Sequence, residues 1–150
     1  MSTTKIILKN AFFIYVGIVV YFLLMKILGL DGVSELRFLN FIFVLWGVNN
    51  AIKTNMNLNK ETLYISNLSV GTATATLGVA FTIIGLMIYV GFINPEFMTV
   101  LENSSFWGKE LSLVKVIFAL AIEGIASSLI CAFILMQYYK NYEVSKMAAQ

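Results

Sequence analysis

The sequence predicts an all-α integral membrane protein, a four-helix bundle with both termini on the cytoplasmic side. Three observations support this fold class: 59% of the 150 residues are hydrophobic, only 12% are charged, and the apolar residues gather in four long windows. The mean hydropathy of +0.86 is far above that of an average soluble domain. A chain this short has too little interior to bury four such windows away from lipid. We therefore expect a single membrane domain that covers residues 1–150.

The first window covers residues 11–30 and is interrupted only by Lys26. Lys5 and Lys9 precede it, as basic residues precede the apolar core of a secretory signal. The apolar run is too long for such a signal, and no cleavage pattern of small residues follows it. We therefore predict a retained first helix.

The second window, residues 36–53, is the shortest and contains Asn49 and Asn50 near its end. The segment that follows reads "KTNMNLNKETLYISN" and is rich in Asn and Lys. Such a composition is typical of a solvated connection, so we predict a loop over residues 54–67.

The third window, residues 68–93, contains no charged side chain. Small residues recur in it at alternating steps of four and three, which keeps them on one face of a helix. Small side chains let transmembrane helices approach closely, so this stripe predicts a packing seam. Three interpretations are open: the stripe packs against another helix of this chain, such as the fourth, it docks another copy or a different subunit, or it lines a ligand cleft. The seam consists of Gly71, Ala75, Gly78, Thr82 and Gly85, and the small residues of the fourth window are Gly124, Ser127, Ser128 and Cys131.

The segment "FINPEFMTVLENSSFWGKE" connects the third and fourth windows and contains the only proline, Pro95. Asn94 could cap a short helix here. Phe97, Met98 and Leu101 recur at the spacing of one helix face. The sequence therefore predicts either a short helix lying on the outer membrane surface or an ordered loop.

The fourth window, residues 111–139, contains Lys115 and Glu123. An ionised carboxylate in mid-membrane costs roughly 3 kcal/mol on insertion scales, so Glu123 must be paired, hydrated or protonated. Within the chain, Lys26 is the best candidate partner. Three roles remain open for Glu123: a carboxyl that ties helices together, an ion- or proton-coupling site, and a contact with a partner subunit.

The positive charges predict the orientation, because short loops rich in Lys and Arg stay in the cytoplasm. With four spans, most of these residues fall on the side of both termini. That side carries Lys5, Lys9, Lys53, Lys60, Lys140 and Lys146, whereas the other side carries Arg37 and Lys109.

The composition excludes most site chemistry. Histidine is absent and Cys131 is the single cysteine, so the commonest metal ligand, the usual general base and any intrachain disulfide are missing. No phosphate-binding glycine loop, serine elbow or nucleic-acid-binding basic patch is present. We therefore expect no cofactor, no metal site, no enzymatic activity and no nucleic-acid partner.

The chain resembles a domain-of-unknown-function family of small four-helix inner-membrane proteins common in Bacteroidota. The glycine-spaced third window leading into "YVGFINPEF" and the fourth window ending in "QYYKN" carry the resemblance. It implies a bacterial inner-membrane protein and transfers no catalytic or binding residue. The expected function is a non-enzymatic accessory or scaffolding subunit whose partners are the lipid bilayer and other membrane subunits or another copy. The alternative is a small ion- or proton-coupled transporter that uses Glu123.

Overall fold

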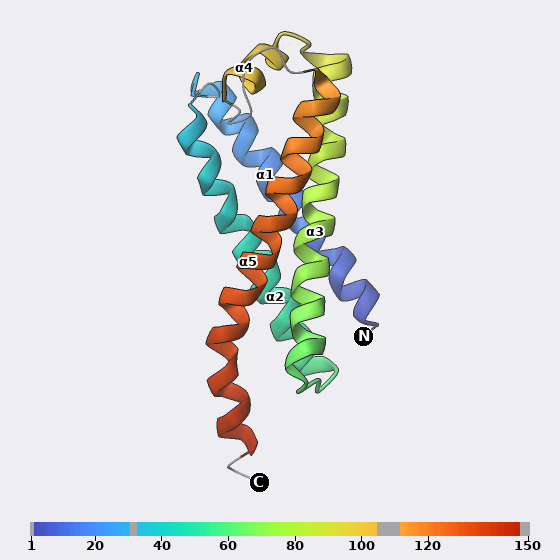
Figure 1. Ribbon diagram of the computed structural model, residues 1–150. Coiled ribbons are helices and arrows are strands. Elements are labelled where there is room, and N and C mark those ends of the chain that lie inside the picture. The colour runs from blue at the N-terminus through green and yellow to red at the C-terminus, as the bar shows by residue number, and fades with distance from the viewer. Residues whose placement is uncertain (1, 31–32, 105–111, 148–150) are drawn as a thin grey trace.

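The computed structural model describes residues 2–30, 33–104 and 112–147, and these residues form helices and no β-strand. Four long helices run side by side in alternating directions (Figure 1). The two ends of the described chain lie at the end of the molecule that holds the connection 59–63, and the short helix 97–104 lies at the opposite end (Figure 1). In chain order the elements are α1 (Thr3–Ile27), η1 (Ser34–Leu39), α2 (Asn40–Leu58), α3 (Tyr64–Ile88), η2 (Tyr89–Ile93), α4 (Phe97–Ser104) and α5 (Leu113–Met147).

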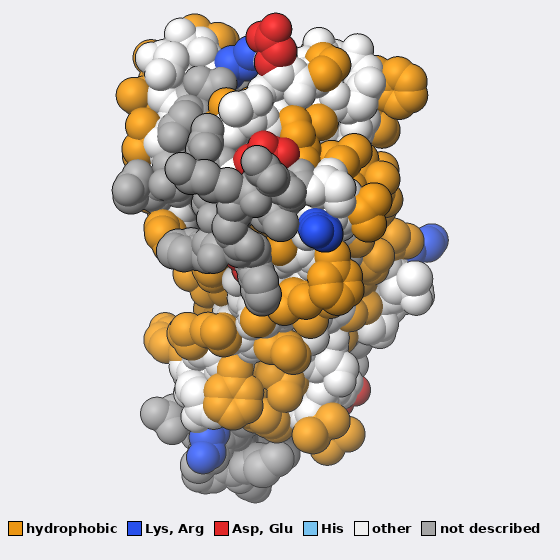
Figure 2. Space-filling model, turned by 45° about the horizontal axis from the view of Figure 1, so that its top comes forward, with side chains coloured by type: hydrophobic (Ala, Val, Ile, Leu, Met, Phe, Trp, Pro, Cys, Tyr) orange, Lys and Arg blue, Asp and Glu red, His pale blue; other side chains and the backbone are white. Residues whose placement is uncertain are grey.

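Three helical stretches of the described chain are long and apolar enough to cross a membrane: Thr3–Ile27, Tyr64–Ile93 and Leu113–Lys140. Their outer surfaces carry large apolar side chains, such as Ile27, Val114 and Phe118, which are all more than 65% exposed. Apolar side chains also cover much of the face seen in Figure 2. Such a surface suits lipid and not water. The predicted all-helical class is therefore confirmed, and three helical stretches of the described chain have the length and composition of membrane-spanning helices.

Helix α2 is not among these three stretches. Its five asparagines and Lys53 lower its hydropathy, although apolar residues make up much of the rest of the helix. The second predicted window is also displaced, since residues 34–39 form a 3₁₀ helix and α2 begins only at Asn40.

The prediction of a solvated loop over residues 54–67 is wrong. Helix α2 continues to Leu58 and α3 begins at Tyr64, so only residues 59–63 connect them. Lys60 has a φ of 50°, the left-handed conformation that reverses the chain in this short connection. The composition indicates a loop, but the Asn55 amide of α2 donates to Asn67 Oδ1 of α3 at 2.9 Å, and this bond lets both helices continue.

The other windows agree with the helices in position but not at every end. Helix α1 begins eight residues before the predicted start at residue 11, and α5 continues beyond residue 139 to Met147. Polar residues add turns to a helix that an apolar segment has already nucleated, so hydropathy underestimates helix length. Lys109 and residue 111, where the fourth window was expected to begin, lie outside the described residues.

The short helix predicted after Pro95 exists as α4, so the ordered-loop alternative is wrong. Its apolar face is turned inward, however. Phe97 and Leu101 are each 6% exposed and pack in one cluster with Val90 and Val116. Helix α4 therefore closes one end of the helix packing.

Candidate functional site

The seam residues nearest the connection between α2 and α3 pack inside the chain. A Cβ on Gly71 would lie 3.0 Å from Ile52 Cδ1 and 3.1 Å from Val48 Cγ1, both on α2. A Cβ on Gly78 would lie 2.9 Å from Ile14 Cγ2 on α1. Ala75, between these glycines, is fully buried. These positions need small residues because α1 and α2 lie directly against them.

The other end of the seam borders a cavity. Thr82 and Gly85 line it, and a Cβ on Gly85 would lie 2.9 Å from Tyr15 Cε2. The Thr82 hydroxyl donates to the Gly78 carbonyl at 2.8 Å, which satisfies the hydroxyl within its own helix. One stripe of small residues thus serves as a packing surface at one end and as a cavity wall at the other.

The fourth predicted helix, α5, approaches α3 closely at its own small residue Gly124. A Cβ on Gly124 would overlap Val79 Cγ1 of α3, and Ser128 and Cys131 are buried. The α3 seam meets α5 at Gly71, whose added Cβ would lie 3.4 Å from Ala132 Cβ. The seam therefore faces α1 and α2 more than it faces α5.

Asn49 and Asn50 connect α2 to two other helices. The Asn50 amide donates to Asn10 Oδ1 of α1 at 2.7 Å, and Asn10 donates in turn to the Ile6 carbonyl at 2.8 Å. The Tyr139 hydroxyl of α5 donates to Asn49 Oδ1. Hydrogen bonds of this kind hold helices together where no water competes for the amides.

A second amide pair connects α2 to α3, and sequence reasoning missed it by placing both residues in a loop. Asn55 and Asn67 are 2% and 0% exposed, and the Asn55 amide donates to Asn67 Oδ1 at 2.9 Å. Asn59 donates to Asn55 Oδ1 at 2.8 Å, and Asn67 donates to the Glu61 carbonyl at 3.0 Å. A signal was available, since Asn55 and Asn59 lie one helical turn apart.

The two ionisable residues singled out within the windows lie at different places. Lys26, in the last turn of α1, donates to the Tyr89 hydroxyl, and its ammonium lies 5.0 Å from the Tyr89 ring centroid. Glu123 lies on the exposed face of α5. It does not line the cavity, although its backbone carbonyl accepts a hydrogen bond from the cavity residue Ser127 at 2.6 Å.

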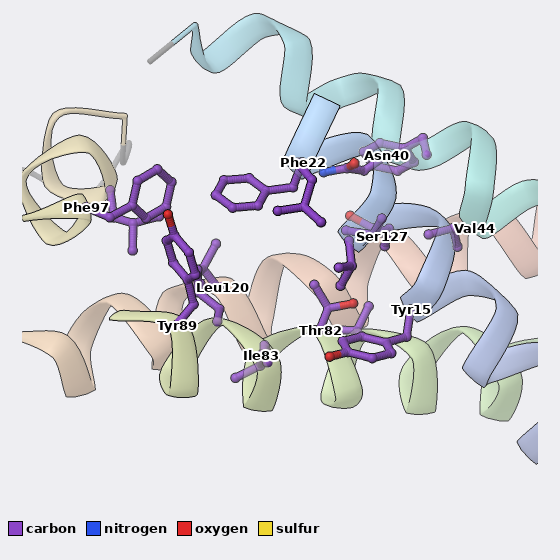
Figure 3. Close-up of a pocket in the computed structure, with 18 of the residues that line it drawn as sticks. Tyr15, Phe22, Asn40, Val44, Thr82, Ile83, Tyr89, Phe97, Leu120 and Ser127 are labelled. Carbon is purple, nitrogen blue, oxygen red and sulfur yellow. The ribbon is translucent and has the colours of Figure 1, made fainter. Parts of the chain in front are cut away.

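The cavity lies between the helices at the α4 end and has a volume of about 330 Å³. Helices α1, α2, α3, α4 and α5 all contribute to its walls (Figure 3). In the halves of α2 and α5 that lie away from α4, Val48, Ile52 and Met136 belong to one packed core. In the halves toward α4, Val44 of α2 and Leu120 of α5 line the cavity instead.

Aromatic rings close the cavity on the α4 side. Phe22, Tyr89 and Phe97 make three edge-to-face contacts with centroid distances between 5.2 and 5.5 Å. All three rings line the cavity (Figure 3). This arrangement holds α4 against α1 and η2, and such ring pairs contribute about 1 kcal/mol each beyond area burial.

Asn40, the first residue of α2, gives the cavity a polar group (Figure 3). Within the described part of the chain, its Oδ1 atom is buried and accepts no hydrogen bond. A buried acceptor without a donor is costly, whereas a ligand that brings an O–H or N–H group removes that cost. Apolar walls with few polar groups are typical of small-molecule sites in proteins. Six separate elements, the five α-helices and η2, form this site, so no local motif could reveal it.

The described residues contain no group of three or more His, Cys, Asp or Glu side chains that could hold a metal ion. Comparisons with protein-family models, curated proteins and solved structures find no match for the chain.

Proposed function

We propose that the protein is a non-enzymatic integral membrane protein that serves as an accessory or scaffolding subunit of a larger assembly in a bacterial inner membrane. In this proposal α1, α2, α3 and α5 all cross the bilayer, and both termini are cytoplasmic. The observation that carries the proposal is the position of Glu123 on the outer face of α5, within the stretch Leu113–Lys140.

The surroundings of Glu123 favour a protein partner there over lipid. Ala126 and Ile130, three and seven residues further along α5, share its face and are exposed as well. The small Ala126 beside Glu123 permits close approach of another transmembrane helix, so we place the partner on this face of α5.

Two observations support the crossing of α2 despite its polar residues. Side-chain hydrogen bonds join Asn49, Asn50 and Asn55 to α5, α1 and α3, so each of these amides has a partner on another helix of the protein. A helix of 19 residues is also about 28 Å long, close to the hydrocarbon thickness.

Photocrosslinking in membranes tests the partner. A photoreactive amino acid at Ala126 should crosslink to one discrete membrane protein, and Glu123→Leu should abolish that product. The same probe at Phe12, on the exposed face of α1, serves as the control and should give no discrete product. Crosslinks from Ala126 to lipid alone, in the native membrane, would contradict the accessory role.

Cysteine labelling tests the four crossings. In a Cys131→Ala background, Ser2→Cys and Lys60→Cys should react with an impermeant maleimide only from the cytoplasmic side. Thr99→Cys, in α4, should react only from the other side. Labelling of positions 2 and 60 from opposite sides would refute the crossing of both α1 and α2.

Proton flux tests the alternative transporter role. The purified chain in liposomes should give no more proton uptake than protein-free liposomes. Substrate-driven uptake that disappears with Glu123→Gln would overturn the accessory role and make Glu123 a coupling carboxylate.

A further inference from the structure

We propose that the outer face formed by α1 and α2 binds one phosphatidylglycerol molecule, with its phosphate between two lysines and a hydrocarbon chain along two aromatic rings. The lysines are Lys9 and Lys53, and the rings are Phe13 and Trp46. The inference rests on the proposed crossing of α1 and α2 and not on the accessory role, because Glu123 and its partner take no part in it. The order of aromatic, amide and cationic groups along this face carries it.

Two contacts align the exposed residues of the antiparallel helices α1 and α2. The rings of Phe13 and Trp46 meet edge to face, with their centroids 6.2 Å apart, and are 42% and 55% exposed. One helical turn further toward the amino-terminal end of α1, the Asn50 amide donates to Asn10 Oδ1 at 2.7 Å. An aromatic pair and an amide pair therefore follow one another along the boundary between the two helices.

Lys9 and Lys53 lie beside the amide pair, one on each helix. Lys9 precedes Asn10, and its ammonium lies 6.0 Å from the Phe13 ring centroid. Lys53 follows Asn50 by three residues and therefore lies on the same face of α2. Both lysines are exposed, and neither helix contains an Asp or Glu. The two helices thus present two cations and supply no counter-ion of their own.

Asn50 adds a neutral donor next to the lysines. Its amide has two N–H groups, of which Asn10 uses one, and the residue is exposed. Within the described part of the chain, the Asn50 side chain makes no other hydrogen bond. Ammonium and N–H groups are the donors that bind phosphate oxygens most strongly in proteins. The α1–α2 face therefore has the chemistry of a phosphate site.

The depth of these groups suits a lipid phosphate. Lys9 and the exposed Ile27 are 18 residues apart in α1, which is about 27 Å, and the hydrocarbon core of a bilayer is about 30 Å thick. With Ile27 at one edge of the hydrocarbon, Lys9 lies at the other. Trp46 lies about 10 Å before Lys53 along α2, so the rings lie on the hydrocarbon side of the lysines. One lipid can therefore contact the lysines with its phosphate and the rings with a chain.

Net charge decides which phospholipid binds. Phosphatidylcholine and phosphatidylethanolamine carry a cation next to the phosphate, and the two lysines repel it. Phosphatidylglycerol carries the phosphate without a cation. Each lysine near a membrane surface favours an anionic lipid by about fivefold in affinity, so two lysines favour it by about 25-fold.

Trp46 reports directly on this site. Trp107→Phe leaves Trp46 as the single tryptophan of the chain, and lipids brominated on their acyl chains quench tryptophan fluorescence on contact. The full chain is placed in phosphatidylcholine vesicles that contain an equal minor fraction of brominated phosphatidylglycerol or brominated phosphatidylcholine. The two degrees of quenching give the relative affinity. We expect phosphatidylglycerol to be preferred by about 25-fold.

Three lysine variants of this reporter chain test the site. Lys9→Gln and Lys53→Gln should each lower the preference about fivefold, and the double variant should bring it close to one. Lys60→Gln, in the connection 59–63, removes the same charge beyond the end of α2 and should leave the preference unchanged. Quenching by brominated phosphatidylcholine should be equal in all variants, which shows that each is folded and inserted alike.

Equal quenching by the two lipids in the reporter chain would overturn the inference and leave the crossing of α2 intact. A loss of preference in Lys60→Gln as large as that in Lys9→Gln would also overturn it, since overall surface charge would then explain the preference. Absence of quenching by either lipid would overturn both the lipid site and the crossing of α2. None of these results bears on crosslinking from Ala126.

Discussion

Gly47→Ala should destabilise the protein by about 2 kcal/mol, because Ile14 fills the space that the new methyl group needs. A Cβ on Gly47 would lie 2.7 Å from Ile14 Cδ1 and closer still to Cγ1. Carbon atoms in favourable contact are about 3.5 to 4.0 Å apart, so the overlap is about 1 Å or more. Ile14 is fully buried and cannot turn toward solvent.

Ile14 cannot move away from α2 either, because Gly78 of α3 lies behind it. A Cβ on Gly78 would lie 2.9 Å from Ile14 Cγ2, so α1 presents one side chain to a glycine on each neighbouring helix. Overpacking of this kind costs up to about 3 kcal/mol. Alanine recovers about 1 kcal/mol through its higher helix propensity, which leaves about 2 kcal/mol. The ratio of folded to unfolded protein should fall by about 30-fold.

Unfolding by sodium dodecyl sulfate in mixed micelles, followed by tryptophan fluorescence, measures this change. Gly91→Ala is the matched control, since no atom lies within 4 Å of the added Cβ and its φ is not positive. We expect that control to be as stable as the original chain or more stable by up to about 1 kcal/mol.

A double-mutant cycle tests whether Ile14 is the cause. Ile14→Ala alone should cost about 2 to 5 kcal/mol through the cavity it leaves. The double mutant Ile14→Ala/Gly47→Ala should lose at least about 1 kcal/mol less stability than the two single mutants lose together, because the new methyl group no longer meets the Ile14 side chain. Additive costs, or a Gly47→Ala protein as stable as Gly91→Ala, would refute the packing described for α1 and α2.

The hydrogen bonds of α2 give two further predictions, both measured by the same unfolding experiment. Asn55→Ala should cost about 1 to 2 kcal/mol, since it leaves Asn67 Oδ1 without its donor from α2, whereas Asn57→Ala at an exposed position should stay within about 0.5 kcal/mol. Equal effects of the two would mean that the buried amide pair contributes nothing. Tyr139→Phe should cost about 0.6 kcal/mol, the mean for hydrogen bonds between membrane helices, and Tyr138→Phe, 76% exposed, should cost less. A larger loss from Tyr138→Phe would contradict the Tyr139 contact with Asn49.

The asparagines show where prediction from sequence stops. The sequence places Asn49 and Asn50 inside an apolar window, whereas the Asn- and Lys-rich composition around Asn55 and Asn67 predicts a loop. A side-chain amide without a protein partner is best placed in water, as in a loop. It can lie within a packed helix where a second amide bonds to it, as Asn67 Oδ1 accepts from the Asn55 amide at 2.9 Å. The partner lies 12 residues away on another helix, so no local pattern contains it.

The amino-acid sequence by itself determined the helical class, the approximate positions of the long apolar helices, the short helix after Pro95 and the stripe from Gly71 to Gly85. These features follow from hydropathy and helical periodicity, which are properties of neighbouring residues. Only the tertiary structure decided which helices the stripe contacts, that Lys26 contacts Tyr89, and that six elements line a cavity with Asn40 in its wall. The physical reason is that close packing and hydrogen bonds between helices depend on residues distant in the chain, whose relative placement is fixed only when the helices pack together.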